Sequence, residues 1–382
     1  MFVILIKNIE VYNPEYIGRK DVLICGGKIA LIEDNIEIFS EKIQTINGTG
    51  KKLIPGFIDN HVHIVGGGGE GSFKTRVPEI TLSKLVEAGI TTVVGLLGTD
   101  STTRSIENLV AKAKALREEG ISAYALTGAY ELPSPTLTNS VKKDIVFIEE
   151  IIGVKIALSD HRSSSLTQVE LARLASDARV AGMLSGKAGI VVAHMGDGEK
   201  GLGMINEVLI ETDIPIRTIR PTHVNRREEL LIESLEYAKK GGIIDLTCGS
   251  NEELSPGKVV QRAEIEGIPL ENITISSDGY GSWSRYDEKG NMTKIGVSQV
   301  NSLYEEFRTM VLELGIDIEK ALKFFTSNVS RALNFYPKKG TIMEGSDADF
   351  LIVDGNLEIK TVIAKGQLMM KDGELLKTGT YE

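Results

Sequence analysis

The feature that most restricts the fold of this chain is a regular alternation of apolar segments with amphipathic ones. Eight apolar segments have the length and composition of buried strands. They lie at residues 53–63, 91–100, 122–130, 153–160, 189–197, 216–224, 241–250 and 273–282. Stretches with helical periodicity separate them, most clearly at residues 81–89, 105–120, 167–184 and 227–242. Eight strand–helix units over roughly 280 residues predict an α/β fold, a (β/α)8 TIM barrel.

The two ends of the chain have a different pattern. Residues 1–55 and 340–382 carry short strand-like runs separated by glycine- and asparagine-rich turn signals, without long helical periodicity. Because chain termini often lie close together, the two ends are predicted to pair. We expect one small β-sandwich domain from residues 1–55 plus 340–382, beside a barrel domain at residues 56–339.

The amino-acid composition limits the partners and the cellular compartment that this protein is expected to have. The 382 residues include 43 Lys and Arg against 53 Asp and Glu, a net charge of −10, which argues against a nucleic-acid surface. No apolar run approaches the roughly 18 residues of a membrane span, and the N-terminal MFVILI is typical of a strand rather than a signal peptide. The two cysteines, Cys25 and Cys248, lie far apart and fit a reducing compartment. These features predict a cytoplasmic protein without membrane or nucleic-acid partners.

Polar residues fall where a barrel would place its chemistry, at the C-terminal ends of the strands. His61 and His63 end the first predicted strand, His194 and His223 lie near the ends of the fifth and sixth, and Asp278 closes the eighth. Residues i and i+2 of a strand point to the same face, so the first two imidazoles can face one ion. Taken singly, His194 or His223 is more often a core or surface histidine than a metal ligand. Together with the carboxylate they form a set suited to zinc or a similar divalent ion.

The other predicted strands differ in what they offer. Thr99 and Tyr130 end the second and third, whereas the seventh carries only Thr247 and Cys248, neither an obvious ligand. His161 lies just past the fourth strand, and its role stays open.

Lys155 interrupts the apolar fourth strand, where a buried ammonium would be costly. One interpretation is that its amine extends to the rim of the barrel. The other is that burial lowers its pKa, so that a neutral amine forms a Schiff base or reacts with carbon dioxide. The resulting carbamate would be an anionic ligand able to bridge two cations.

Two loops follow these strands. The glycines at 66–69 would let the backbone approach a ligand and leave Glu70 uncrowded, although a four-glycine run is often only a flexible loop. The run lacks the Gly-Lys-Ser/Thr of a phosphate loop. Residues 282–296 contain a turn signal at 288–291 and predict a hairpin near the site.

Several motifs together carry a family resemblance. The segments GFIDNHVHIVGGGGEG, VVGLLGTD, LTGAYELPSPT, GVKIALSDHRSS, PTHVNR and SSDGYGS are similar to those of the isoaspartyl dipeptidase family within the amidohydrolase superfamily. The resemblance covers essentially the whole chain, including GSDADFLIVD near the C-terminal end.

The resemblance implies a binuclear zinc centre. Its six ligands in this chain would be His61, His63, Lys155, His194, His223 and Asp278. The first two histidines would hold one zinc ion and the other two the second. Lys155, carboxylated on N6, would bridge both ions, and Asp278 would also bind the first.

The resemblance further implies a zinc metallopeptidase that cleaves the β-aspartyl isopeptide bond of isoaspartyl dipeptides. Two neighbouring divalent ions lower the pKa of a bridging water, which attacks as hydroxide. Asp278 would take up the proton and deliver it to the leaving amine. Tyr130 would donate to the developing oxyanion, unless its ring only caps the core.

The substrate-binding positions implied by the family are Glu70, Thr99, Tyr130, Arg162, Arg226 and Ser282. A carboxylate at Glu70 suits an ammonium group, and the guanidinium groups of Arg162 and Arg226 suit carboxylates. The family also implies a homo-oligomer.

Two other functions compete with this reading. A hydantoinase- or dihydroorotase-like cyclic amide hydrolase shares the barrel and the carbamate, but a neutral cyclic amide offers no ammonium to Glu70. A non-catalytic scaffold on the same fold is expected to have lost metal ligands, whereas all six are present here.

Overall fold

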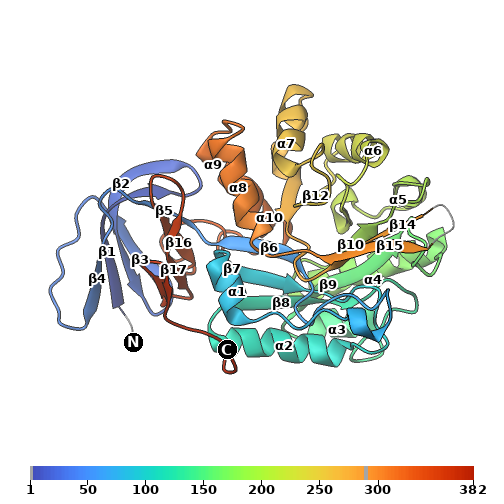
Figure 1. Ribbon diagram of the computed structural model, residues 1–382, viewed down its shortest axis with the longest axis horizontal. Helices are drawn as coiled ribbons and strands as arrows, with labels where there is room; N and C mark the ends of the chain where they lie inside the picture. The colour runs from blue at the N-terminus through green and yellow to red at the C-terminus, as the bar shows by residue number, and fades with distance from the viewer. Residues whose placement is uncertain (1–2, 288–290) are drawn as a thin grey trace.

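The computed structural model describes residues 3–287 and 291–382. Figure 1 shows two bodies: a barrel surrounded by helices, and a separate sheet whose strands come from the N-terminal part of the chain, in blue, and the C-terminal part, in red. Among the described residues, no helix is long and apolar enough to cross a membrane.

The larger body is the predicted barrel. Its eight parallel strands follow one another in chain order around the sheet. They are β6 (Phe57–Val62), β7 (Ile90–Gly95), β8 (Ser122–Gly128), β9 (Ile151–Leu158), β10 (Ile190–Met195), β11 (Ile219–Thr222), β12 (Ile244–Thr247) and β13 (Ile273–Ser276). The first strand meets the segment after the last one where Val62 bridges Gly279, and the amide of His63 donates to the Gly279 carbonyl at 2.9 Å. The C-terminal ends of the first and last strands therefore lie side by side.

Helices cover the outside of the barrel (Figure 1). They are α1 (Leu82–Glu87), α2 (Ile106–Glu119), α3 (Val141–Phe147), α4 (Gln168–Ser185), α5 (Gly203–Glu211), α6 (Glu228–Lys239), α7 (Pro256–Ile265), α8 (Ser302–Leu312), α9 (Ile318–Phe325) and α10 (Ser327–Ala332), with short 3-10 turns at Phe73–Thr75, Ile216–Thr218 and Leu270–Asn272. The longest, α4, begins at a capping box between Thr167 and Glu170 and ends at the left-handed Gly186. All four helical stretches predicted from periodicity are present.

The smaller body is a nine-stranded sheet. It consists of β1 (Val3–Tyr12), β2 (Tyr16–Cys25), β3 (Lys28–Glu33), β4 (Ile43–Asn47), β5 (Lys52–Pro55), β16 (Phe350–Val353), β17 (Ile359–Ala364), β18 (Gln367–Lys371) and β19 (Glu374–Leu375). Strand β5 joins the two chain ends, since it pairs with β1 on one side and with β16 on the other. Both ends of the chain thus build one β domain, as predicted. The boundaries at residues 55 and 340 and the sandwich arrangement stay predictions.

A two-stranded antiparallel hairpin follows the barrel's last strand. It consists of β14 (Ser282–Tyr286) and β15 (Met292–Val297), which pair with Ser282 opposite Val297 and Tyr286 opposite Met292. The hairpin predicted from residues 282–296 is present, but residues 288–290 of its turn signal lie outside the described residues.

Candidate active site

A cavity of about 280 Å³ opens at the C-terminal ends of the barrel strands. It is lined by ten of the predicted site residues: His63, Glu70, Thr99, Tyr130, Arg162, His194, His223, Arg226, Asp278 and Ser282. The remaining two, His61 and Lys155, are buried residues on β6 and β9. All twelve positions thus lie at one end of the barrel or in the interior just beneath it.

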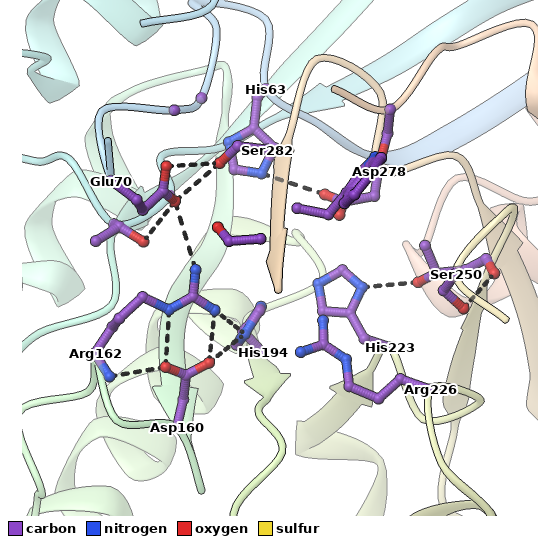
Figure 2. A pocket seen from close by; sticks show the side chains of 18 of the residues that line it. His63, Glu70, Asp160, Arg162, His194, His223, Arg226, Ser250, Asp278 and Ser282 are labelled. Atoms are coloured by element: carbon purple, nitrogen blue, oxygen red, sulfur yellow. Dashed lines mark hydrogen bonds and ion pairs between the residues drawn. The ribbon is translucent and has the colours of Figure 1, made fainter. Parts of the chain in front are cut away.

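The first group of candidate ligands comes from β6 and the segment after β13. Nε2 of His63 lies 3.3 Å, and Nε2 of His61 3.5 Å, from Oδ1 of Asp278. Val62, between the two histidines, packs in the hydrophobic core. The backbone turns sharply at Asp278, where φ is 52°, and this turn directs the carboxylate back toward β6 (Figure 2).

The second group is placed by β10 and β11. The rings of His194 and His223 lie 4.7 Å apart between centroids, and His223 is also 4.7 Å from His61. Nδ1 of His223 is 2.8 Å from the Thr247 hydroxyl. The Tyr130 hydroxyl lies 2.7 Å from Nδ1 of His194. The two predicted histidine pairs therefore face one another across one small volume.

Lys155 lies wholly within the barrel. Its side chain is buried, and Nζ is 3.0 Å from Nε2 of His61. The alternative in which the amine extends to the rim is wrong, because β9 places the side chain inside the closed barrel. Burial lowers the pKa of Lys155 to about 7.

The chemistry of these donors fits a divalent cation. Burial lowers the pKa of His61, His194 and His223 well below the usual range, so the imidazoles are neutral and keep an electron pair. The ring nitrogens of His61 and His63 lie close to Oδ1 of Asp278, but this oxygen makes no hydrogen bond with any described residue. Nδ1 of His63 makes none either. One ligand atom from each of His61, His223 and Asp278 lies within 4.8 Å of the others. Electron-pair donors that face one another without a shared proton are typical of a metal site.

Glu70 is held at the other side of the cavity. The Ser282 hydroxyl lies 2.8 and 2.9 Å from its two oxygens, and the Thr99 hydroxyl donates to Oε1 at 3.3 Å. The preceding loop requires glycine: a Cβ atom at Gly66 or Gly68 would lie about 2 Å from a carbonyl oxygen, and both residues have positive φ. The loop therefore passes tightly beneath the cavity and fixes the carboxylate.

The wall of the cavity is completed by Arg162, Arg226, Asp197 and His161. Nη1 of Arg162 lies 3.5 Å from Oε1 of Glu70, and Nη1 of Arg226 lies 3.6 Å from Oδ1 of Asp197. His161 lines the same cavity with an exposed side chain. In Figure 2, Arg226 lies below His223, Arg162 lies to the left of His194, and Glu70 lies above Arg162.

The sequence reasoning missed Asp160. Its Oδ1 accepts hydrogen bonds from the backbone and Nε of Arg162 at 2.8 and 2.9 Å. Its Oδ2 lies 2.7 Å from Nη2 of Arg162 and 3.0 Å from Nε2 of His194. Burial would raise the pKa of Asp160, but these hydrogen bonds outweigh burial and hold it far below its usual range. In the sequence, Asp160 could have been found as a candidate site residue because it is the last residue of the predicted strand at 153–160.

Asp245 was missed as well. This buried carboxylate on β12 accepts hydrogen bonds from Asn60, Thr222, Thr274 and Ser276 in the barrel interior. The Thr222 hydroxyl is also 3.4 Å from Nδ1 of His61. The seventh strand thus supplies no candidate metal ligand at its C-terminal end. Its Asp245 instead contacts Thr222, which lies next to the candidate ligand His61.

Comparisons with known proteins agree with this arrangement. The family model of the amidohydrolase family matches residues 53–369. The crystal structure of a β-aspartyl dipeptidase from Fervidobacterium islandicum AW-1, in complex with β-Asp-Leu dipeptide, is 44% identical, covers 98% of each chain and superposes with a TM-score of 0.93. A second structure of β-aspartyl dipeptidase from that organism is 42% identical over 98% of each chain, with a TM-score of 0.90. A dihydroorotase from Elusimicrobium minutum is 26% identical over 92% of this chain and 88% of its own.

Proposed function

Because the chain belongs to the amidohydrolase family, we propose that it is a metal-dependent dipeptidase that hydrolyses the β-aspartyl bond of isoaspartyl dipeptides. The observation that carries the proposal is the combination of charges in one cavity. A carboxylate at Glu70 and guanidinium groups at Arg162 and Arg226 surround a cluster of metal-type donors. The similarity to β-aspartyl dipeptidases over 98% of the chain supports the same substrate class.

The charges match the groups of the substrate. An isoaspartyl dipeptide carries an α-ammonium, an α-carboxylate and a C-terminal carboxylate around the bond that is cleaved. Glu70 would bind the ammonium together with Thr99 and Ser282, whose hydroxyls already contact its oxygens. Arg162 and Arg226 would each bind a carboxylate, because a guanidinium offers several donors in one plane.

The proposed cofactor is a pair of zinc ions. His61 and His63 would hold one ion together with Asp278, and His194 and His223 the other. Lys155, carboxylated on Nζ, would contact both. Bound there, the ions would supply a water of lowered pKa and polarise the scissile carbonyl.

Two side chains of the protein would handle the proton and the oxyanion. Asp278 takes the proton of the attacking water and passes it to the leaving amine, since its carboxylate faces the cavity and its Oδ1 has no hydrogen bond to another described residue. Tyr130 donates its hydroxyl hydrogen to the carbonyl oxygen as negative charge develops. Burial raises the pKa of Tyr130, so this donor stays protonated. The homo-oligomeric state and the cytoplasmic location are also part of the proposal.

A second candidate is a cyclic amide hydrolase of the dihydroorotase or hydantoinase type. It is favoured by the dihydroorotase relative, which is 26% identical over most of both chains. It leaves Glu70 unexplained, however, because neither a neutral hydantoin nor the anionic dihydroorotate has an ammonium to pair with a carboxylate held by two hydroxyls.

The test is hydrolysis of β-Asp-Leu by the zinc-loaded protein, with α-Asp-Leu, dihydroorotate and hydantoin as parallel substrates. We expect cleavage of β-Asp-Leu alone. In Glu70→Gln we expect KM for β-Asp-Leu to rise roughly 10-fold or more, because the ammonium loses its charged partner. Ring opening of a cyclic amide without dipeptide cleavage would reject the dipeptidase in favour of the second candidate.

A further inference from the structure

Asp160 uses all of its hydrogen-bonding capacity inside the protein. Its side chain is 3% exposed. Arg162 donates three hydrogen bonds to its two oxygens, and His194 approaches one of them at 3.0 Å. An ionised carboxylate has about four acceptor positions, so Asp160 has none left for a substrate ammonium or a cation. Asp160 therefore acts on a ligand only through Arg162 and His194.

The carboxylate is also fixed in place by its backbone. A Cβ atom at Gly196 would lie 2.4 Å from Cβ of Asp160 and from the carbonyl oxygen of Ser159. The loop after β9 and the loop after β10 are therefore packed directly against each other. Because Gly196 follows His194 by two residues, this contact holds the carboxylate and the imidazole at a constant separation.

The contact with His194 determines where that ring carries its hydrogen. An ionised carboxylate only accepts hydrogen bonds, so its 3.0 Å contact favours a proton on Nε2 of His194, over the longer 3.5 Å approach of Nη2 of Arg162 to the same nitrogen. Nδ1 then keeps its electron pair and accepts the Tyr130 hydroxyl at 2.7 Å. A neutral imidazole with one nitrogen fixed by a carboxylate and the other directed into a cavity is the form that binds a metal.

The contact with Arg162 determines which part of the guanidinium meets the cavity. Nε and Nη2 are both engaged by the carboxylate, at 2.9 and 2.7 Å. Nη1 is left facing Oε1 of Glu70 at 3.5 Å. Figure 2 shows the fork of Arg162 closed on Asp160, with the remaining nitrogen pointing up toward Glu70. Arg162 therefore presents a fixed edge to a ligand.

We propose that Asp160 is a positioning residue that locks the metal-binding form of His194 and the substrate-facing edge of Arg162 with one carboxylate. Metal affinity and substrate affinity consequently depend on the same side chain. The part that concerns the substrate rests on the proposed function, whereas the part that concerns His194 does not.

The first experiment compares Asp160→Asn with wild type in two assays. Asparagine has nearly the same shape, but it replaces an acceptor oxygen by a donor and cannot serve both partners. We expect zinc affinity, measured by competition with a chromophoric chelator in the absence of substrate, to fall about 10- to 100-fold. We expect KM for β-Asp-Leu to rise as well. Asp177→Asn, at an exposed position of α4, is the matched control and should change neither value.

Arg162→Lys separates the two effects. It removes the fork but leaves the carboxylate next to His194, so KM should rise while zinc affinity stays within about threefold of wild type. Unchanged zinc affinity in a folded Asp160→Asn would overturn the proposal, whatever happens to KM.

A second experiment needs no variant of Asp160. Long-range ¹H–¹⁵N spectra of the metal-free wild type report which nitrogen of each of its five histidines is protonated. The His194 signals are identified by their loss in His194→Gln. Protonation at Nε2 is the expected result, and protonation at Nδ1 would overturn the proposal. A wild type that binds zinc but does not cleave β-Asp-Leu would reject the proposed function, while the chelator and NMR results would still decide the role of Asp160.

Discussion

Nζ of Lys155 lies 3.0 Å from Nε2 of His61 inside the barrel, where both side chains are buried. Burial disfavours the charged amine and lowers its pKa to about 7. A much larger share of this amine is therefore neutral at neutral pH than of an exposed lysine, which, with a pKa of about 10.4, is almost fully charged there. A neutral amine next to an imidazole ligand is suited to take up carbon dioxide.

We therefore predict that Lys155 forms a carbamate. Protein reconstituted with Zn²⁺ in ¹³C-bicarbonate should show one carbamate carbon signal, which is absent from Lys155→Gln and kept in Lys143→Gln, at an exposed position. At a fixed concentration of dissolved carbon dioxide, the neutral fraction of the amine rises with pH, so reconstitution should be faster at pH 8 than at pH 6. The same signal in Lys155→Gln would place the carbamate elsewhere.

Tyr130→Phe removes the hydroxyl that lies 2.7 Å from Nδ1 of His194. If this hydroxyl stabilises the developing oxyanion, kcat for β-Asp-Leu should fall about 100-fold or more with little change in KM. Because burial raises the pKa of Tyr130, its loss of a proton should not limit the wild-type rate up to pH 10. A variant that raises KM and leaves kcat unchanged would assign the hydroxyl to substrate binding instead.

The sequence predicts those parts of this molecule that follow from a repeating local pattern. Alternating apolar and amphipathic segments predict the barrel, and parallel strands in a barrel bring their C-terminal ends to one side. His61, His194 and His223 therefore come together although they are far apart in the chain. The i, i+2 spacing of His61 and His63 is local, and strand geometry alone turns both imidazoles toward one face. Asp278 lies beside them because the barrel brings the end of its last strand next to its first.

The parts that the sequence does not predict depend on neighbours from other strands. Asp245 looks like an interruption of an apolar strand, and its four partners come from segments up to 185 residues away. Asp160 is local to Arg162, but its contact with His194 requires that β9 and β10 be neighbours. The position of Lys155 was likewise open, because only the closed barrel decides between its interior and its rim.

Asp245 gives a prediction on stability. It is buried and accepts hydrogen bonds from three hydroxyls and one amide. Asp245→Ala would leave these donors without their acceptor, so the free energy of unfolding of the metal-free protein should fall by about 2–5 kcal/mol in urea denaturation. Asp213→Asn, at an exposed position, should change it by less than about 0.5 kcal/mol. A similar small change in Asp245→Ala would mean that water replaces the carboxylate.

Lys339 forms a buried cluster of ion pairs with two carboxylates of the segment just before β16. Its ammonium is 2% exposed, lies 2.9 Å from Oδ2 of Asp347 and also contacts Asp349. Lys339→Met would leave both carboxylates without this partner in a largely buried position, so we expect the free energy of unfolding at pH 7 to fall by about 3–5 kcal/mol. Lys239→Met, where the lysine is exposed on α6, is the matched control.

The pH dependence of that loss tests its electrostatic origin. Burial would raise the pKa of Asp347, but the charges and hydrogen bonds of Lys339 and Lys28 outweigh burial and lower the pKa. A lowered carboxyl pKa stabilises the fold above the unfolded value of about 3.9, and this contribution is lost as the pH falls through the folded value. The pKa of Lys339 is raised, so its contribution is complete below about pH 10 and is lost only above that. The difference between wild type and Lys339→Met should therefore be constant from about pH 6 to 9 and shrink at acid pH, as Asp347 takes up a proton and loses its ion pair with Lys339. A difference that stays constant down to pH 3 would assign the loss to packing of the lysine stem instead.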